Sequence, residues 1–226
     1  MNVEEKLCEF WEARRSLQPN TRTFRPFHGW QRGAGKHLVF LFRVKAPEIL
    51  KIIAEVQADL CGDEAFVPFP SEYLHITVKV WGFLEDKKDA ADDILPKELE
   101  RAIPHLRENV ATVKAFETEL GRVNVFPSVV FAEVKDGGGF AELNRKVLEI
   151  PGVEARWSDH PNYIPHLAIG TFREGTDVEP LMKMLETRRK SAFGKITVGN
   201  IELVIAHWRD SKFPIFEPLC QVELQP

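Results

Sequence analysis

The order of predicted strands and helices repeats along this chain, and this repetition constrains the possible folds more than any other feature. Each half reads as strand, helix, strand, helix and closing strand. Positions in the two halves are related by a nearly constant shift: 130 − 39 = 91 for Val39 and Val130, and 140 − 49 = 91 for Ile49 and Phe140. Few residues are identical at this shift, so the shared order of elements carries the inference. The sequence therefore predicts an α+β fold of two similar units related by a pseudo-twofold axis.

Strands are indicated by runs of β-branched and aromatic residues, and helices by apolar residues at helical spacing. In the first unit we expect strands at 38–44, 73–83 and 113–126, with helices at 47–62 and 97–110, the latter interrupted at Pro104. In the second unit we expect strands at 129–134 and 166–172, a strand or hairpin at 196–208, and helices at 139–150 and 178–190.

Residues 1–36 precede the repeats and are predicted to be an N-terminal extension containing a short helix. Residues 37–226 are then a single bilobal domain with a central groove, with repeats at about 37–126 and 128–223. The segment GAGKH at 33–37 is not a phosphate loop, because no glycine stands five residues before Gly35 and His37 replaces the hydroxyl residue that would hold magnesium. This excludes the usual nucleoside-triphosphate enzymes, and a glycine turn before a strand is the simpler interpretation.

Composition excludes several other classes of protein. A net charge of −4 and a pI of about 6.0 do not fit non-specific binding to nucleic acid. The three cysteines are scattered, which argues against a disulfide framework, and the histidines lack zinc-site spacing. Neither a signal peptide nor a membrane span is indicated. We therefore expect a cytoplasmic protein with no metal and no cofactor.

Two histidines occupy equivalent positions of the two units, since 166 − 75 = 91. In a strand, alternate residues point to the same face. His75, Thr77 and Lys79 are therefore expected on one face, with apolar residues on the other. His166 and Ala168 repeat this arrangement, and the pseudo-twofold axis would bring the two histidines towards each other.

A facing pair of histidines suits phosphodiester chemistry. One imidazole can deprotonate the attacking water or hydroxyl while the other protonates the leaving oxygen, because the unperturbed pKa of histidine lies near 6.5. A hydroxyl two residues after a histidine, as at Thr77, could donate a hydrogen bond to a phosphate oxygen. A single His-x-Thr is a weak signal, and a common structural role for His75 and His166 is the alternative interpretation.

Three further side chains near the histidines are candidate substrate contacts. Lys79 could offer its charge to a phosphate, or be a solvated strand lysine. Tyr73 and Tyr163, each shortly before a histidine, could stack on a base. Packing at the edge of the core is the alternative for both tyrosines.

The motifs YLHITVKVWGF, GRVNVFPSVVFAEV and YIPHLAIGTF, together with the repeated order of elements, resemble those of the 2H phosphoesterase superfamily, which includes RNA 2′-5′ ligase-like and cyclic phosphodiesterase proteins. The resemblance covers about residues 37–223. It implies two His-x-Thr/Ser motifs lining a central groove and acting without metal. His75 and His166 would then be the acid and base, and Thr77 would hold phosphate.

The sequence departs from that pattern at Ala168, which stands where the second threonine or serine is expected. Thr171 is not expected to replace it, because strand alternation would point it to the opposite face. One hydrogen bond to a charged group is worth about 1.5–3 kcal/mol, so its absence would lower a rate by roughly ten- to a hundredfold.

The function predicted from the sequence is metal-independent hydrolysis of a cyclic 2′,3′-type or 2′-5′ phosphodiester by paired-histidine catalysis. The expected partner is a nucleotide or an RNA end carrying such a phosphate, and no membrane is expected as a partner. Two alternatives stay open: a non-catalytic or weakly catalytic nucleotide-binding or RNA-end-binding protein on the same scaffold, and a 2′-5′ RNA ligase. Which histidine is acid and which is base depends on the direction of the reaction.

Overall fold

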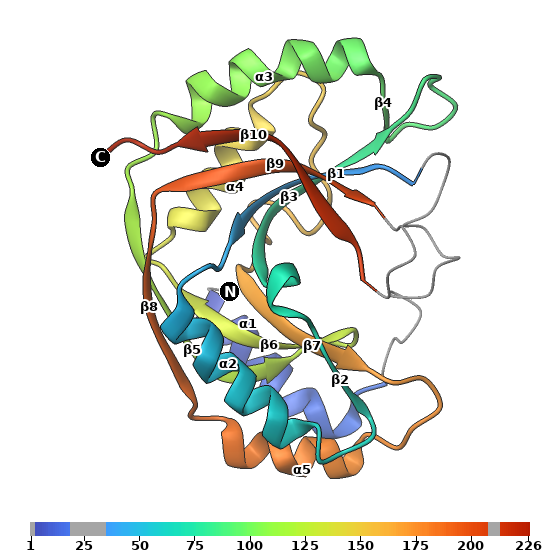
Figure 1. The fold of residues 1–226 in the computed structure, drawn as a ribbon, viewed down its shortest axis with the longest axis vertical. Helices are drawn as coiled ribbons and strands as arrows, with labels where there is room; N and C mark the ends of the chain where they lie inside the picture. The colour runs from blue at the N-terminus through green and yellow to red at the C-terminus, as the bar shows by residue number, and fades with distance from the viewer. Residues whose placement is uncertain (1–2, 19–34, 208–212) are drawn as a thin grey trace.

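A computed structural model describes residues 3–18, 35–207 and 213–226 and has a mixed helix and strand architecture (Figure 1). Its strands form a single curled, largely antiparallel sheet, with helices packed on its faces. The predicted α+β class is confirmed. Part of the predicted N-terminal extension, residues 19–34, lies outside the described residues, and the domain boundary at residue 36 stays a prediction.

Within the described residues the sheet contains ten strands, in the order β10-β9-β1-β3-β7-β6-β5-β8, with β2 paired to β7 and β4 paired to β3. The strands are β1 (His37–Arg43), β2 (Phe66–Pro68), β3 (His75–Leu84), β4 (Asp93–Ile94), β5 (Phe116–Val125), β6 (Val129–Lys135), β7 (His166–Phe172), β8 (Ala192–Val198), β9 (Asn200–His207) and β10 (Ile215–Glu223).

Five α-helices occur in the described residues: α1 (Val3–Ala13), α2 (Pro47–Leu60), α3 (Pro96–Val110), α4 (Gly139–Leu148) and α5 (Glu179–Arg188). Short 3-10 turns follow α1 at Arg14–Ser16 and precede β3 at Ser71–Tyr73. Both α2 and α3 begin at a proline, whose missing N–H would have no partner in a first helical turn. Each buries an apolar stripe, such as Ile49, Ile53 and Val56 in α2.

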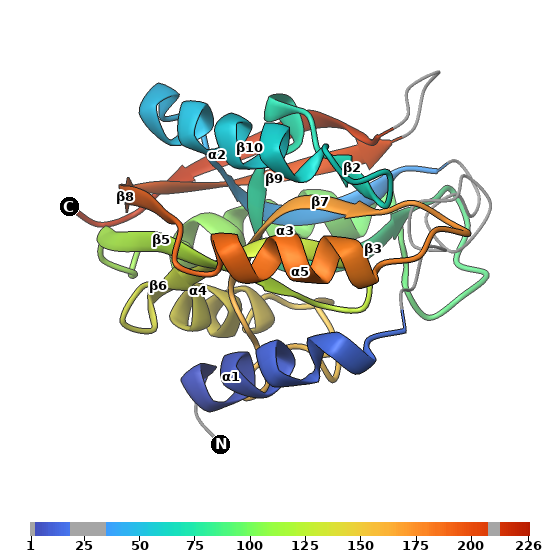
Figure 2. The same ribbon diagram turned by 90° about the horizontal axis from the view of Figure 1, so that it is seen from below.

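The helices cover both faces of the curled sheet. Helices α2 and α5 pack on one face of the lobe formed by β5 to β8, and α1 contacts β5 from the other side (Figure 2). Helix α4 packs on β3 and α3 in the other lobe. The sheet consequently keeps one concave face that helices cover only in part.

The strand order is mirrored about the β3–β7 pair, with β1 and β6 as the next neighbours on either side. Strands β3 and β7 each carry a bulge. Val78 of β3 has no partner on β1, and Ile169 of β7 has none on β6. The bulges are equivalent at the predicted shift, since 169 − 78 = 91. This agrees with the predicted duplication and pseudo-twofold symmetry, which themselves stay predictions.

The structure differs from the expected elements at three points. The segment 196–208 is neither one strand nor a hairpin, because β8 ends at Val198 and pairs with β5, whereas β9 begins at Asn200 and pairs with β1 and β10. Helix α3 is not interrupted at Pro104 but continues through it. Pro104 is exposed, so the backbone carbonyl that loses its partner can bond to water while Leu99, Leu106 and the rest of the apolar stripe stay buried. The short strands β2 and β4 and the last strand β10 were not predicted. In the described ranges, no helix has the length and apolar composition needed to cross a membrane.

Candidate active site

The two lobes of the sheet are joined at one residue pair next to both histidines. Strands β3 and β7 pair in antiparallel register through Ile76 and Leu167 only, and both of these residues are fully buried. In that register His75 is level with Ala168, and His166 is level with Thr77. All four are half-buried and border the same groove, so they form one cluster.

Both histidine rings are held in the same way. The Nδ1 atom of His75 lies 2.5 Å from the carbonyl oxygen of Tyr73, and that of His166 lies 2.9 Å from the carbonyl oxygen of Ile164. A carbonyl oxygen can only accept, so Nδ1 carries the proton in both rings. This leaves each Nε2 atom with a free electron pair, and that of His75 lies 3.1 Å from the Oγ1 atom of Thr77.

Burial shifts both histidines towards the neutral form. It lowers the pKa of His75 to about 4, against the hydrogen bond to Tyr73, which raises it, while the charges of His166 and Arg43 lower it further. Burial also lowers the pKa of His166, and the hydrogen bond to Ile164 opposes this shift. The charge of one ring therefore acts on the other, as expected for two imidazoles sharing a site.

A groove of about 770 Å³ contains the cluster. The residues that border it come from α1, the segment between β2 and β3, strands β3, β6 and β7, the segment after β5 and the loop before β7. Six of these residues are aromatic: Phe10, Phe69, Tyr73, Phe126, Trp157 and Tyr163. An apolar groove with a few polar groups is typical of a small-molecule site.

Lys79 does not follow the predicted alternation. Thr77 pairs with Leu41 and Lys79 with its chain neighbour Phe40, so the bulge at Val78 turns the two side chains to opposite faces. The Lys79 ammonium is buried and forms an ion pair with Asp159. The geometry therefore does not support the predicted contact of Lys79 with phosphate.

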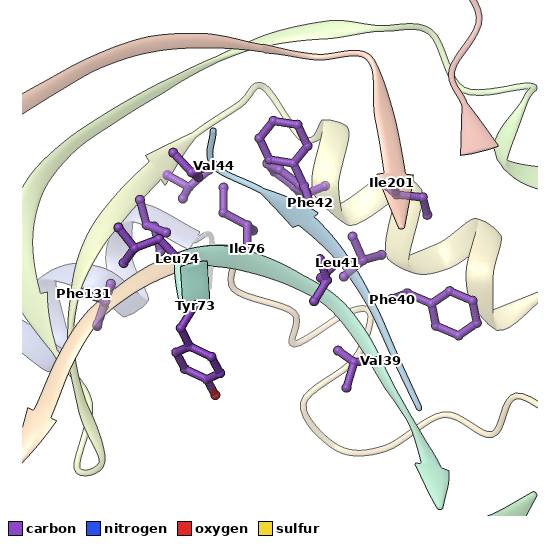
Figure 3. Packing of buried hydrophobic residues seen from close by; sticks show 14 of the residues in the cluster. Val39, Phe40, Leu41, Phe42, Val44, Tyr73, Leu74, Ile76, Phe131 and Ile201 are labelled. Atoms are coloured by element: carbon purple, nitrogen blue, oxygen red, sulfur yellow. The ribbon is translucent and has the colours of Figure 1, made fainter. Parts of the chain in front are cut away.

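The side chains of the two candidate tyrosines are buried by packing and are not exposed for stacking on a base. Tyr73 is 6% exposed, its ring lies parallel to that of Phe216 at 5.0 Å, and it points to the opposite side of the chain from Ile76 (Figure 3). The Tyr163 hydroxyl donates to the carbonyl oxygen of Thr77 at 2.6 Å. Tyr163 thus fixes the backbone of β3 next to the histidine. Stacking of either ring on a base is not supported.

The missing second hydroxyl is not supplied by Thr171. The bulge at Ile169 interrupts the alternation on which the expectation for Thr171 rested. Thr171 is nevertheless 5% exposed, and its hydroxyl donates to the carbonyl oxygen of Ser128 at 2.8 Å. Ala168 borders the groove directly. The roles predicted for His75, Thr77, His166 and Ala168 stay predictions, with a geometry compatible with each.

Apart from Tyr163, the loop before β7 was not identified from the sequence as part of the site. Trp157 borders the groove and is 85% exposed, and the neighbouring Arg156 donates to the carbonyl oxygen of Trp81 at 3.2 Å. Asp159 anchors this loop through Lys79 and through the Asn144 amide at 3.0 Å. A tryptophan within a polar segment was the only available signal.

A sequence model of the 2′-5′ RNA ligase superfamily matches residues 42–209. No curated protein matches the chain. Residues 42–209 include both histidines and most of the sheet, but neither α1 nor β10.

Several solved structures share the fold. E. coli LigT complexed with NADP+ is 17% identical, with a TM-score of 0.61, and the match covers 84% of this chain and 98% of LigT. TT0787 of Thermus thermophilus is 17% identical, with a TM-score of 0.60 and coverage of 84% and 98%. A structure described as a phosphoesterase is 15% identical, with a TM-score of 0.65 and coverage of 84% and 99%. The curled sheet is thus a shared architecture.

Proposed function

The chain belongs to the 2′-5′ RNA ligase superfamily, and we propose that it is a metal-independent phosphodiesterase acting on a cyclic 2′,3′-type or 2′-5′ phosphodiester. The observation that carries the proposal is the matched environment of His75 and His166. Each ring donates from Nδ1 to the carbonyl oxygen two residues earlier, so its Nε2 atom carries no proton, and both residues border the same groove. A purely structural role would not require both rings to keep an unprotonated Nε2 atom at the same groove.

The reaction follows from this arrangement. One Nε2 atom takes a proton from a water molecule, whose oxygen forms a bond to phosphorus. The bond from phosphorus to the 2′ or 3′ oxygen breaks, and the other histidine, protonated at Nε2, donates its proton to that oxygen. For a cyclic substrate the product is a nucleoside monophosphate, and the pair again holds one proton. The same two groups would serve the reverse direction, which is ligation.

Thr77 is the proposed phosphate contact. Its hydroxyl lies 3.1 Å from the Nε2 atom of His75 and can turn to donate to a non-bridging oxygen that gains charge in the transition state. Its backbone carbonyl is held by Tyr163. Ala168 offers no second donor, which supports the alternative of a protein that binds such phosphates and turns them over slowly.

The ligands in the solved structures of LigT belong to the same chemical class as the proposed substrate. LigT from E. coli has been crystallised with NADP+, phosphate, 3′-AMP and ATP. All contain phosphate, and most contain a purine nucleotide. The three free cysteines further support our proposal that this chain acts in a reducing compartment such as the cytoplasm.

The test is hydrolysis of a 2′,3′-cyclic nucleotide with excess EDTA present. We expect the nucleoside monophosphate as product, at a rate that the chelator does not change. Full loss of turnover on chelation, restored by zinc or manganese, would contradict the metal-independent mechanism. Tight nucleotide binding without any product would identify the binding-only alternative.

A further inference from the structure

Helix α1 is seated on the concave face of the sheet beside the groove. Leu7 is 5% exposed, and its carbonyl oxygen accepts a hydrogen bond of 2.8 Å from the Nδ2 atom of Asn124 in β5. Glu4 lies 3.8 Å from Arg122 of the same strand. Because the helix backbone contacts the strand directly, no ligand can pass between them at this point.

The inner side of α1 borders the groove next to His166. Phe10 packs edge-on against Phe126 at 4.8 Å, and Phe126 packs edge-on against the His166 ring at 4.9 Å. Lys6, Glu9 and Phe10 all border the groove. The three aromatic rings thus form a continuous barrier that begins at the histidine and ends on the helix.

The helix also meets the loop that forms the adjacent side. The Lys6 ammonium donates to the Oδ1 atom of Asn162 at 3.3 Å, which joins α1 to the segment carrying Trp157 and Asp159. This contact closes the corner between the helix and the loop.

The charges that the described residues place around the groove do not provide a path for a long strand. A protein that follows a nucleic-acid backbone uses a positively charged track. Among the groove residues described, the basic ones are Lys6, Arg156 and Lys79, and Lys79 is already paired with Asp159. Glu9 stands on the helix close to Lys6 and would repel further phosphates.

We propose that α1 is the end wall of the substrate groove. The enzyme then selects a single nucleotide or the last phosphodiester of a chain over a linkage within a long strand. This rests on the proposed function for the identity of the reacting group, but the wall itself depends only on the packing of α1. It assigns a role in selectivity to a helix outside the matched family region.

The test compares kcat/KM for two substrates, a 2′,3′-cyclic nucleoside monophosphate and a ribohexanucleotide with one 2′-5′ linkage at its centre. We expect the wild type to prefer the first by at least about tenfold, the discrimination typical of a small difference in fit to a pocket. Phe10→Ala should reduce this preference at least about fivefold, and Phe10→Trp should increase it. Because both substrates use His166, an indirect effect on that ring cancels in the ratio.

Glu12→Ala is the matched control, since Glu12 is exposed on the same helix and does not border the groove. It should leave the preference unchanged, and melting curves should show that all variants are folded. An unchanged preference in both folded Phe10 variants would overturn the wall, as would equal use of the two substrates by the wild type.

Equilibrium binding separates this proposal from the proposed function. In a His75→Ala background, calorimetry gives the affinities of a 3′-nucleoside monophosphate and of the same hexanucleotide. Phe10→Ala should improve hexanucleotide binding at least about fivefold relative to the mononucleotide. If Phe10→Ala improves relative hexanucleotide binding, but no variant with both histidines hydrolyses either substrate, the end-wall proposal stands and the proposed phosphodiesterase activity is refuted. Failure of both ligands to bind would refute both proposals.

Discussion

The protonation of two imidazole rings decides what this groove can do. In the structure both Nδ1 atoms donate to carbonyl oxygens, and both pKa values are lowered, chiefly by burial. Without substrate, both rings are therefore mostly neutral. A neutral ring can accept a proton at Nε2, but it cannot act as the acid. A phosphodiester brings a negative charge that favours the protonated form of either ring. Substrate binding and proton uptake should therefore be coupled.

This coupling predicts the pH dependence of activity. The reactive free enzyme carries one proton on the pair, and the pair titrates as a unit. Since both pKa values lie below the ordinary value, at about 4 for His75, kcat/KM should be bell-shaped with its maximum below about pH 6.5. Above the maximum it should fall because the acid loses its proton. The kcat profile should lie at higher pH than the kcat/KM profile. A kcat/KM maximum at or above pH 7 would contradict this assignment.

The hydroxyls beside the histidines give a second prediction at this scale. Ala168→Ser places a donor on the groove, level with His75, and should hold or raise turnover of a cyclic nucleotide, by up to about a hundredfold. Thr77→Ala should lower turnover by a similar factor. Initial rates and melting temperatures of both variants provide the measurement.

Thr171→Val is the matched control, because its hydroxyl bonds to Ser128 outside the groove. It should keep its rate and lose about 1 kcal/mol of stability. If neither Ala168→Ser nor Thr77→Ala changes turnover, the phosphate does not lie between these strands.

Sequence reasoning succeeds at this scale where the strand alternation is undisturbed. The period of two places His75 with Thr77, and His166 with Ala168, up to the bulges at Val78 and Ile169. Beyond a bulge, the side chains that the alternation predicts for one face lie on the other. No residue type marks the position of a bulge, so Lys79 lies on the face opposite to the predicted one. Its partner Asp159 comes from a distant loop, and only the folded chain brings the two together.

The elements around the site are positioned by a buried polar network between a loop and a strand. Asp159 accepts from Lys79, from the Asn144 amide and from the backbone N–H of Arg156 at 2.6 Å. Asn144 also donates to the carbonyl oxygen of Val78 at 2.8 Å. Helix α4, the loop and the bulge of β3 are thereby tied together behind the histidine. These bonds hold the loop carrying Trp157.

Removing one partner of this network should be costly. Asp159→Ala leaves the Lys79 ammonium buried without its counter-charge and should lower the free energy of unfolding by about 3–5 kcal/mol. The exposed pair of Lys88 and Glu98 offers a matched control, and Lys88→Ala should change stability by less than about 1 kcal/mol. Urea unfolding of both variants measures the difference. Equal effects would show that the buried pair does not stabilise the loop.

The order of the elements was predictable to the extent that each has its own pattern. Apolar stripes identified α2 to α5, and β-rich runs identified the central strands. Strand β10 carries Pro218 and exposed residues at most positions, so its pattern is weak, and pairing with β9 alone defines it. The seat of α1 on β5 was not predictable, since it depends on Asn124 bonding to a backbone carbonyl 117 residues away.

At the scale of the whole molecule, function depends on how two lobes meet. Their strands pair only at Ile76 and Leu167, so the sheet opens on either side of one joint. The groove lies over this joint and contains a histidine from each lobe. Neither lobe contains both histidines, so the proposed acid and base come together only when the two lobes are assembled.

The most direct test of the account is turnover of a 2′,3′-cyclic nucleotide by His75→Ala, His166→Ala and the double variant, with melting curves to confirm that all are folded. If the two rings act as one acid and base unit, each single variant should lose nearly all activity, and the double variant should be little worse than either. If either single variant is folded and turns over the substrate at a rate like that of the wild type, paired-histidine catalysis is contradicted.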